Sequence, residues 1–166
     1  MRGLAGALTG VALVGALACG NDAPTGPPEL RLGVDVCDGC GMAIAESRHA
    51  AAALADEDSG RRILKFDDIG CLARWEAGAS ESTVRVRWVH DRTTEAWIDA
   101  GAATFSRTPQ LATPMGSGLA AFRIASDADA LVTERGGESL SWNAILALAR
   151  DGSLEQHTRS GQEVAR

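Results

Sequence analysis

RILKFDDIGCLARW, at residues 62–75, is the stretch that indicates the fold. Residues 62–66 have the composition of a short strand, and an apolar helix is expected from about Ile69 to Trp75. Asp67 and Asp68 stand between the two, where a carboxylate can accept the free N–H groups of the first helical turn. Helix capping is therefore the main role that we expect of this acidic pair.

The same order recurs in the second half of the chain. A strand is expected at 119–124, and Ser126 and Asp127 then follow as caps of a helix that runs through about Thr133. In both halves a strand thus leads into a helix that begins at an aspartate. This recurrence predicts a duplicated α+β unit.

Weaker patterns fill in the remaining elements. An alanine-rich stretch at 49–54 precedes a turn at 56–60, strands are expected at 83–90, 96–100 and 103–105, a turn at 136–137, and a helix at 141–150. Four tryptophans are expected to anchor an otherwise aliphatic core, because aromatic side chains bury a large area; they are Trp75, Trp88, Trp97 and Trp142.

Composition and charge exclude some classes of function. The chain has 166 residues, of which 45% are hydrophobic and 23% charged, which is typical of a soluble globular protein. Its net charge is −6 and Lys65 is its only lysine, whereas binding to nucleic acid requires clustered lysine and arginine. The sequence contains no pattern of a Ser–His–Asp set or a phosphate-binding glycine loop, so we expect neither a nucleic-acid partner nor an enzyme.

The N-terminus has the features of a secretory signal. Arg2 provides a basic start, residues 3–18 are uncharged and mainly Leu, Ala, Val and Gly, and Cys19 follows directly. The apolar run is shorter than the ~20 residues of a transmembrane helix. We therefore expect residues 1–18 to be a lipoprotein signal peptide and Cys19 to carry the lipid, which would place the protein on the periplasmic face of a bacterial membrane.

Three further segments follow the signal. Residues 19–29 contain three prolines and read as a flexible tether. The folded domain is expected at 30–150. The polar residues 151–166 are expected to be disordered.

CDGCGM, at residues 37–42, carries the densest chemical signal. Cys37 and Cys40 can face one point when the backbone turns, and Met42 adds a thioether. Thiolates and thioethers are soft donors that select Cu(I) over hard cations. Met115 lies in a loop of Pro and Gly, where an apolar side chain has little to pack against unless it is a ligand.

Other readings of these residues stay open at this point. Cys37 and Cys40 could form a structural disulfide, act as a thioredoxin-like redox pair, or contribute to a zinc site. Cys71 could be a buried apolar thiol or, at a helix N-terminus, a functional thiolate. His49 and His90 fall inside the expected fold, and a lone histidine is more often structural than a ligand.

Four motifs together resemble the NosL family of nitrous oxide reductase accessory proteins. They occur in the family's order and span roughly residues 34–124; they are Cys37-x-x-Cys40-Gly41-Met42-x-Ile44, FDDIGC at 66–71, WIDA at 97–100 and TPMGSG at 113–118. The resemblance implies an α+β fold of two ββαβ-like halves, similar to the organomercurial lyase core, which agrees with the duplication.

The resemblance also implies a function. It points to a Cu(I)-binding lipoprotein, a copper chaperone for the copper centre of nitrous oxide reductase, with the apo enzyme and its ABC-transporter assembly machinery as partners. Carried over by position, the Cu(I) donors are Cys40, Met42 and Met115, with Cys37 as a further donor. The alternatives are a thiol–disulfide oxidoreductase that uses Cys37 and Cys40, and a structural surface lipoprotein with a disulfide staple.

Overall fold

The computed structural model describes residues 26–58, 60–79 and 84–155. The expected signal peptide, Cys19 and most of the expected tether lie outside the described residues, as does the tail from residue 156. Within the described part of the chain, no helix combines the length and the apolar composition that a membrane span requires.

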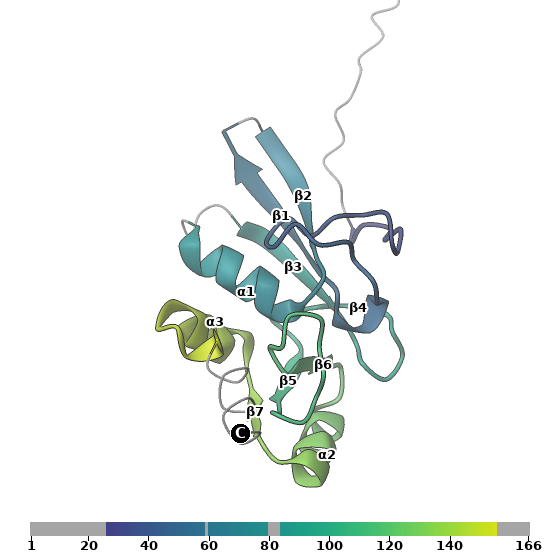
Figure 1. The fold of residues 1–166 in the computed structure, drawn as a ribbon, viewed down its shortest axis with the longest axis vertical. Coiled ribbons are helices and arrows are strands. Elements are labelled where there is room, and N and C mark those ends of the chain that lie inside the picture. Colours follow the sequence, from purple (N-terminus) through teal and green to yellow (C-terminus); the bar gives the residue numbers. More distant parts are fainter. Residues whose placement is uncertain (1–25, 59, 80–83, 156–166) are drawn as a thin grey trace, which may run out of the picture.

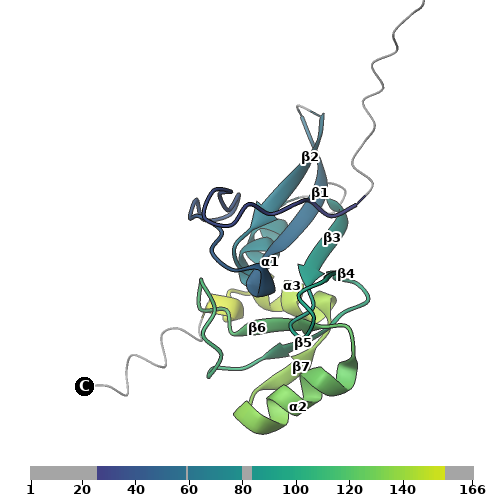
Figure 2. The same ribbon diagram turned by 90° about the vertical axis from the view of Figure 1, so that its right-hand side faces the viewer.

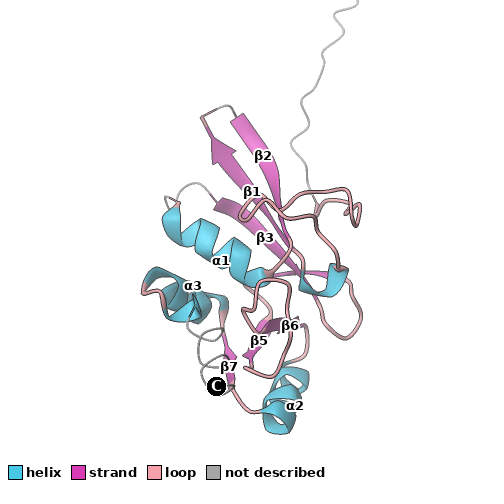
Figure 3. Cartoon of the chain, in the orientation of Figure 1, coloured by secondary structure: helices cyan, strands magenta, loops and turns pink. Residues whose placement is uncertain are grey.

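The first half is built on a four-stranded antiparallel sheet. Its elements are β1 (Ala51–Glu57), β2 (Gly60–Phe66), α1 (Ile69–Gly78), β3 (Val84–His90) and β4 (Trp97–Asp99), and the strand order is β2-β1-β3-β4. Helix α1 lies against one face of the sheet (Figure 1). Between residue 26 and β1 the chain is mainly loop, apart from the short 3-10 helix η1 (Ser47–His49), as Figure 3 shows.

The second half repeats this plan with a smaller sheet. Its elements are β5 (Thr104–Arg107), β6 (Leu119–Phe122), α2 (Ala125–Arg135), β7 (Glu138–Leu140) and α3 (Trp142–Arg150), and the strand order is β6-β5-β7. In both halves the first strand of the unit is flanked by its second and third strands. The expectation of two ββαβ-like halves is confirmed.

Backbone hydrogen bonds at Asp91 join the two halves. Asp91 and Ala121 form an isolated parallel bridge, and the Arg92 N–H donates to the Ala121 carbonyl at 2.8 Å. The Asp91 carboxylate accepts the Arg123 N–H at 2.9 Å. Helices α1 and α3 also pack against each other, so one hydrophobic core runs through both halves (Figures 1 and 2).

Strand β1 is buried on both faces of its sheet. Ala51, Ala53 and Ala55 belong to the main core, whereas Ala52 and Leu54 belong to a second cluster with Trp88 on the opposite face. A strand that is apolar on both faces shows no alternation of polar and apolar residues. For this reason the sequence indicated an alanine-rich stretch here without indicating a strand.

The four tryptophans do not share one environment. Trp88 and Trp142 are buried, as expected, whereas Trp75 and Trp97 are half-buried at the edges of two clusters. The Trp75 ring lies 5.7 Å from the ring of Phe66, measured between centroids. Part of each half-buried indole is therefore exposed to solvent.

Helix capping agrees with the sequence for Asp68 but differs for Asp67 and in the second half. Asp67 accepts the Ala45 N–H at 3.1 Å and does not cap α1. Asp68 is the N-cap of α1 and accepts the Gly70 N–H at 2.6 Å. In α2 the N-cap is Ile124, which has no side-chain cap, so the expected capping by Ser126 and Asp127 is wrong. Asp127 lies instead in the first turn of α2, where its negative charge interacts favourably with the helix dipole.

Three boundaries also differ from the expected ones. Asp56 and Glu57 belong to β1 and not to the turn, because they pair across the hairpin with arginines of β2. Residues 138–140 form β7, an exposed edge strand too short to show a period. The folded part also extends beyond residue 150, since Leu154 is buried in the main core.

Candidate metal centre

A tight turn brings the two cysteines of the CDGCGM segment together. Val36 and Ala43 form an antiparallel bridge, and the Cys37 N–H donates to the Met42 carbonyl at 2.8 Å. Gly41 closes the turn with its N–H on the Cys37 carbonyl, at 2.9 Å, and its φ is +77°. This conformation is one that a residue with a Cβ rarely adopts, so the glycine is required by the turn.

The same turn is fastened to the free edge of β2. The Asp38 N–H donates to the Lys65 carbonyl at 2.8 Å, and the Asp38 carboxylate accepts the Lys65 N–H at 2.7 Å. Arg62 adds an ion pair to the same carboxylate at 2.8 Å. The position of both cysteines is therefore set by the strand that leads into α1.

Cys71 completes a cluster of three thiols. It is the third residue of α1, and its N–H donates to the carbonyl of the cap residue Asp68 at 2.9 Å. The Sγ atoms of Cys37, Cys40 and Cys71 all lie within 4.8 Å of one another, and all three are free thiols. We call these three residues the thiol cluster. Cys37 and Cys71 are buried, whereas Cys40 is half-buried.

The loop that carries Met115 is attached to the start of α1. The second oxygen of the Asp68 carboxylate accepts the Thr113 hydroxyl at 2.7 Å and the Met115 N–H at 3.0 Å. A Cβ placed on Gly70 would lie 2.6 Å from Cβ of Ser117, so the loop and the helix are in direct contact. Glycine at position 70 allows this approach.

Met115 and two of the thiols line one open hollow. Its volume is about 300 Å³, and it is lined by Gly39, Cys40, Cys71, Arg74, Trp75 and Met115. Cys37 lies beneath it, 1% exposed. We call this space the sulfur hollow.

The pKa values within the thiol cluster are driven apart. The pKa of Cys37 is lowered to about 5, chiefly because the Cys71 thiol donates a hydrogen bond to it; backbone N–H groups of Asp67, Cys40 and Gly39 contribute as well. That same hydrogen bond, together with burial, raises the pKa of Cys71. Burial also raises the pKa of Cys40. The hydrogen bond between the two thiols thus favours the thiolate form of Cys37 and the protonated form of Cys71.

The sequence-predicted ligands are only partly brought together. Cys37 and Cys40 lie in the thiol cluster, and Met115 faces it across the sulfur hollow. The Met42 side chain is 52% exposed and does not line the hollow. The sequence left the role of Cys71 undecided between a buried thiol and a functional one. Its position in the first turn of α1, three residues after the cap Asp68, was the feature that could have identified it.

The two histidines of the described residues lie apart from the sulfurs. The His90 ring stacks on Trp97, with centroids 3.7 Å apart, and its Nδ1 lies 3.2 Å from the Ala50 carbonyl. His49 is buried on η1, with Nε2 3.7 Å from a Glu46 oxygen. Neither ring lines the sulfur hollow.

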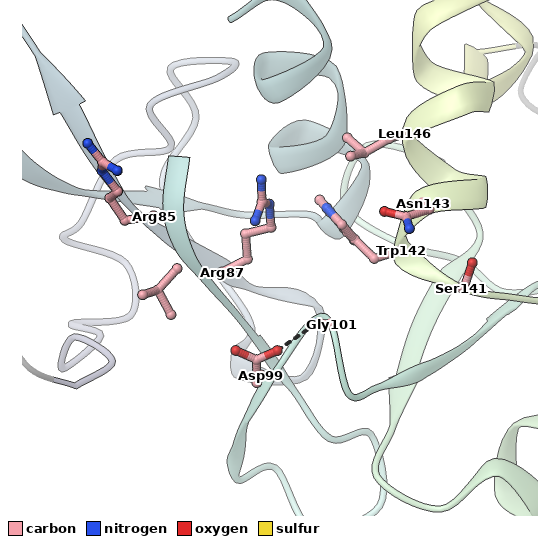
Figure 4. Close-up of a pocket in the computed structure, with 9 residues that line it drawn as sticks. Arg85, Arg87, Asp99, Gly101, Ser141, Trp142, Asn143 and Leu146 are labelled. Carbon is pink, nitrogen blue, oxygen red and sulfur yellow. Dashed lines mark hydrogen bonds between the residues drawn. The ribbon is translucent and has the colours of Figure 1, made fainter. Parts of the chain in front are cut away.

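A second hollow, of about 230 Å³, lies between β3, the turn after β4 and the start of α3 (Figure 4). It is lined by Arg85, Val86, Arg87, Asp99, Gly101, Ser141, Trp142, Asn143 and Leu146. The Arg87 guanidinium is held by Glu76 on α1, with Nε 2.6 Å from Oε2. None of these lining residues carries a sulfur or an imidazole, so this hollow has no soft metal ligand.

The thiol cluster fits a soft metal ion. Three sulfurs that bind one ion at ~2.3 Å in a trigonal plane are ~4.0 Å apart, so three sulfurs within 4.8 Å of one another need only a small movement to bind a common ion. Three thiols and a thioether favour thiophilic ions such as Cu(I) and Zn²⁺ over hard cations, which prefer oxygen.

Comparisons with known proteins identify the fold and the family of the chain. The chain is similar to the crystal structure of the copper chaperone NosL from Shewanella denitrificans, with a TM-score of 0.58 and 20% sequence identity over 70% of this chain and 96% of that chain. At this identity the likeness shows the fold. A search among curated proteins finds no match. The family model of NosL matches residues 32–148, which is more than half of the chain, and the chain therefore belongs to the NosL family.

Proposed function

We propose that this protein is a Cu(I) carrier whose cargo is bound by the thiol cluster and Met115. The observation that carries the proposal is the approach of three cysteine Sγ atoms to within 4.8 Å of one another beside a hollow lined by Met115. This set keeps Cys37, Cys40 and Met115 from the sequence prediction and adds Cys71. Met42, which is exposed and does not line the hollow, is a candidate for contact with an incoming acceptor.

The site is closed on one side and open on the other, which suits a carrier. Cys37 and Cys71 are buried and hold the ion from within. Cys40 and Met115 line the open hollow, where a ligand from an acceptor protein can enter before an original ligand leaves. Transfer by such ligand exchange needs no catalytic acid or base, so a carrier of this kind is not an enzyme.

The same geometry argues against the oxidoreductase alternative. Thiol–disulfide exchange requires an accessible thiolate, because the thiolate is the nucleophile. Here the thiol with the lowered pKa is Cys37, which is 1% exposed, whereas the accessible thiol is Cys40, whose pKa is raised. The acidic thiol is thus shielded and the reachable thiol is protonated.

We further propose that the carrier acts outside the cytoplasm and supplies copper to nitrous oxide reductase, together with the ABC-transporter assembly machinery of that enzyme. Membership of the NosL family supports this client. The apolar run before Cys19 supports a lipid anchor on the periplasmic face of a bacterial membrane. A Cys19→Ala variant should then leave the membrane fraction, and persistence of labelled fatty acid on that variant would refute lipidation at this residue.

Anaerobic competition against a Cu(I) chelator tests the carrier itself. The folded protein should bind one Cu(I) per chain much more tightly than micromolar, and its affinity should fall in acid because thiols must lose protons to bind. X-ray absorption should show a shell of sulfur neighbours. Micromolar or weaker binding, or a shell dominated by nitrogen, would refute the proposal.

The client is tested by transfer. Copper-loaded protein mixed with apo nitrous oxide reductase and its assembly machinery should lose its copper to the enzyme, whereas a Cys71→Ser variant that cannot be loaded should transfer none. If loaded protein retains its copper in that mixture while a small chelator still removes it, the client is a different protein.

A further inference from the structure

Arg74 lies directly on the thiol cluster. It follows Cys71 by three residues on α1, so the two side chains emerge from the same face of the helix. Its Nη2 donates to the Cys71 Sγ at 3.4 Å. Among the described residues that line the sulfur hollow, Arg74 is the one charged side chain.

The Arg74 guanidinium forms no ion pair with a carboxylate in the described part of the chain. Eight other arginines form ion pairs with Asp or Glu: Arg31, Arg48, Arg61, Arg62, Arg85, Arg87, Arg107 and Arg135. Across residues 26–58, 60–79 and 84–155, Arg74 forms no such pair, and its guanidinium donates a hydrogen bond to the Cys71 sulfur instead. In an acidic protein of net charge −6, this leaves a cation available to the site.

The charge of a metal–thiolate complex depends on the ion. A monovalent ion on two thiolates leaves one net negative charge, and on three thiolates it leaves two. A divalent ion on the same ligands leaves a neutral complex or one negative charge. A fixed cation beside the sulfurs therefore stabilises the monovalent complex more than the divalent one, because it attracts the same thiolates but is repelled twice as strongly by the divalent ion.

We propose that Arg74 is a specificity residue that biases the site toward monovalent soft ions, Cu(I) and Ag(I), over divalent thiophilic ions such as Cd²⁺ and Zn²⁺. This rests on the proposed function, since it assumes that the thiol cluster is the cargo site. Arg74 acts through charge on the sulfurs and does not itself bind the metal. The sulfur ligands alone would accept both kinds of ion.

The test compares Ag(I), Cu(I) and Cd²⁺ affinities of the wild-type protein with those of Arg74→Gln and Arg74→Lys. Arg74→Gln should lower the affinity for Cu(I) and Ag(I) by ~10-fold, as the loss of ~1.4 kcal/mol would, and that for Cd²⁺ by ~3-fold or less. Arg74→Lys keeps the charge and should preserve the ratio. Arg61→Gln removes the same charge at the tip of the β1–β2 hairpin and should change neither affinity.

A second measurement varies the concentration of a non-coordinating salt such as sodium perchlorate. Because Arg74 is partly exposed, the salt should screen its charge, so the difference in the ratio of Ag(I) to Cd²⁺ affinity between the wild-type protein and Arg74→Gln should shrink as salt is added. Equal losses for both ions, or a ratio that Arg74→Gln leaves unchanged, would overturn the role of Arg74 while the Cu(I) carrier stands. Failure of the wild-type protein to bind Cu(I) would overturn the carrier itself.

Discussion

The carboxylate of Asp68 accepts a hydrogen bond from the backbone N–H of Met115, at 3.0 Å. The same side chain caps α1 through Gly70 and holds the Thr113 hydroxyl. One fully buried carboxylate therefore fixes the start of the helix that carries Cys71 and the loop that carries the thioether. The two parts of the site, far apart in sequence, share one anchor.

Asp68→Asn should loosen this anchor. An amide offers one acceptor oxygen where the carboxylate offers two, so it cannot accept the Gly70 N–H and the Met115 N–H on separate oxygens. We expect the free energy of unfolding to fall by about 1–3 kcal/mol, the cost of leaving buried donors unpaired. Urea unfolding measures this change. Unaltered stability together with unaltered Cu(I) affinity would contradict the anchoring role.

Gly70→Ala should disturb the contact between α1 and the Met115 loop, because the new Cβ would lie 2.6 Å from Cβ of Ser117. We expect a loss of stability of about 1–3 kcal/mol from overpacking. The double variant Gly70→Ala, Ser117→Gly removes the opposing Cβ and should recover part of the loss. A double-mutant cycle with purely additive effects would show that the two residues are not in contact.

The sulfurs should differ in their contribution to Cu(I) binding. Cys71→Ser replaces a soft donor by a hydroxyl and should lower Cu(I) affinity by at least ~100-fold, a loss of ~2.7 kcal/mol or more. Met115→Leu keeps bulk and apolarity, and we expect a smaller loss. Met42→Leu should have the least effect, because Met42 is exposed away from the sulfur hollow. Competition with a chelator measures these Cu(I) affinities. A larger loss of affinity for Met42→Leu than for Met115→Leu would show that Met42, and not Met115, is the thioether ligand.

Metal binding should stabilise the fold, since an ion that binds only the folded state raises its stability by mass action. The ligands come from the turn before β1, from α1 and from the β5–β6 loop, so the ion links both halves. Differential scanning calorimetry should show a higher melting temperature with Cu(I) or Ag(I). Cys71→Ser should lose most of this increase, and an unchanged melting temperature of loaded wild-type protein would contradict the linkage.

Acid should destabilise the metal-free protein in the range where histidines titrate. Burial lowers the pKa of both His49 and His90 in the folded state. In the unfolded chain a histidine has its ordinary pKa of ~6.5, so below that pH the unfolded state binds more protons than the folded state. The free energy of unfolding therefore falls as the pH drops from ~6.5 toward the lowered pKa of the folded state. Urea unfolding of the metal-free protein at several pH values measures the slope. His90→Gln should make the slope shallower, and an identical slope would contradict its contribution.

The two ββαβ-like halves could be predicted because each leaves a local signal. Phe66 ends a strand pattern directly before the acidic pair that precedes α1, and in the second half the strand pattern of residues 119–124 leads directly into another helix. Strand β1 was not predicted because burial on both faces removes its alternation, and β7 is too short to show a period. Local patterns thus revealed the units but not every strand.

The candidate site was predictable only in part. The turn at 37–42 is local, and the spacing of its two cysteines is visible in the sequence, so Cys37 and Cys40 could be predicted as metal ligands. Cys71 joins them through the tertiary approach of α1 to this turn, where a Cβ placed on Gly39 would lie 3.4 Å from the Cβ and the carbonyl oxygen of Cys71. No sequence period encodes such an approach. The placement of Arg74 follows from the same approach and left no signal of its own.

The two ββαβ-like halves differ in the length of the loop that joins their first two strands. In the first copy β1 ends at Glu57 and β2 begins at Gly60, whereas in the second copy residues 108–118 separate β5 from β6. The long hairpin loop of one copy reaches the helix start of the other and delivers Met115 there. A gene duplication alone would have produced two similar, unconnected helix starts. The longer loop makes the two helix starts different, because it lets the second half complete the binding site of the first. A protein with a shortened loop should therefore keep both halves folded but lose Met115 from the site.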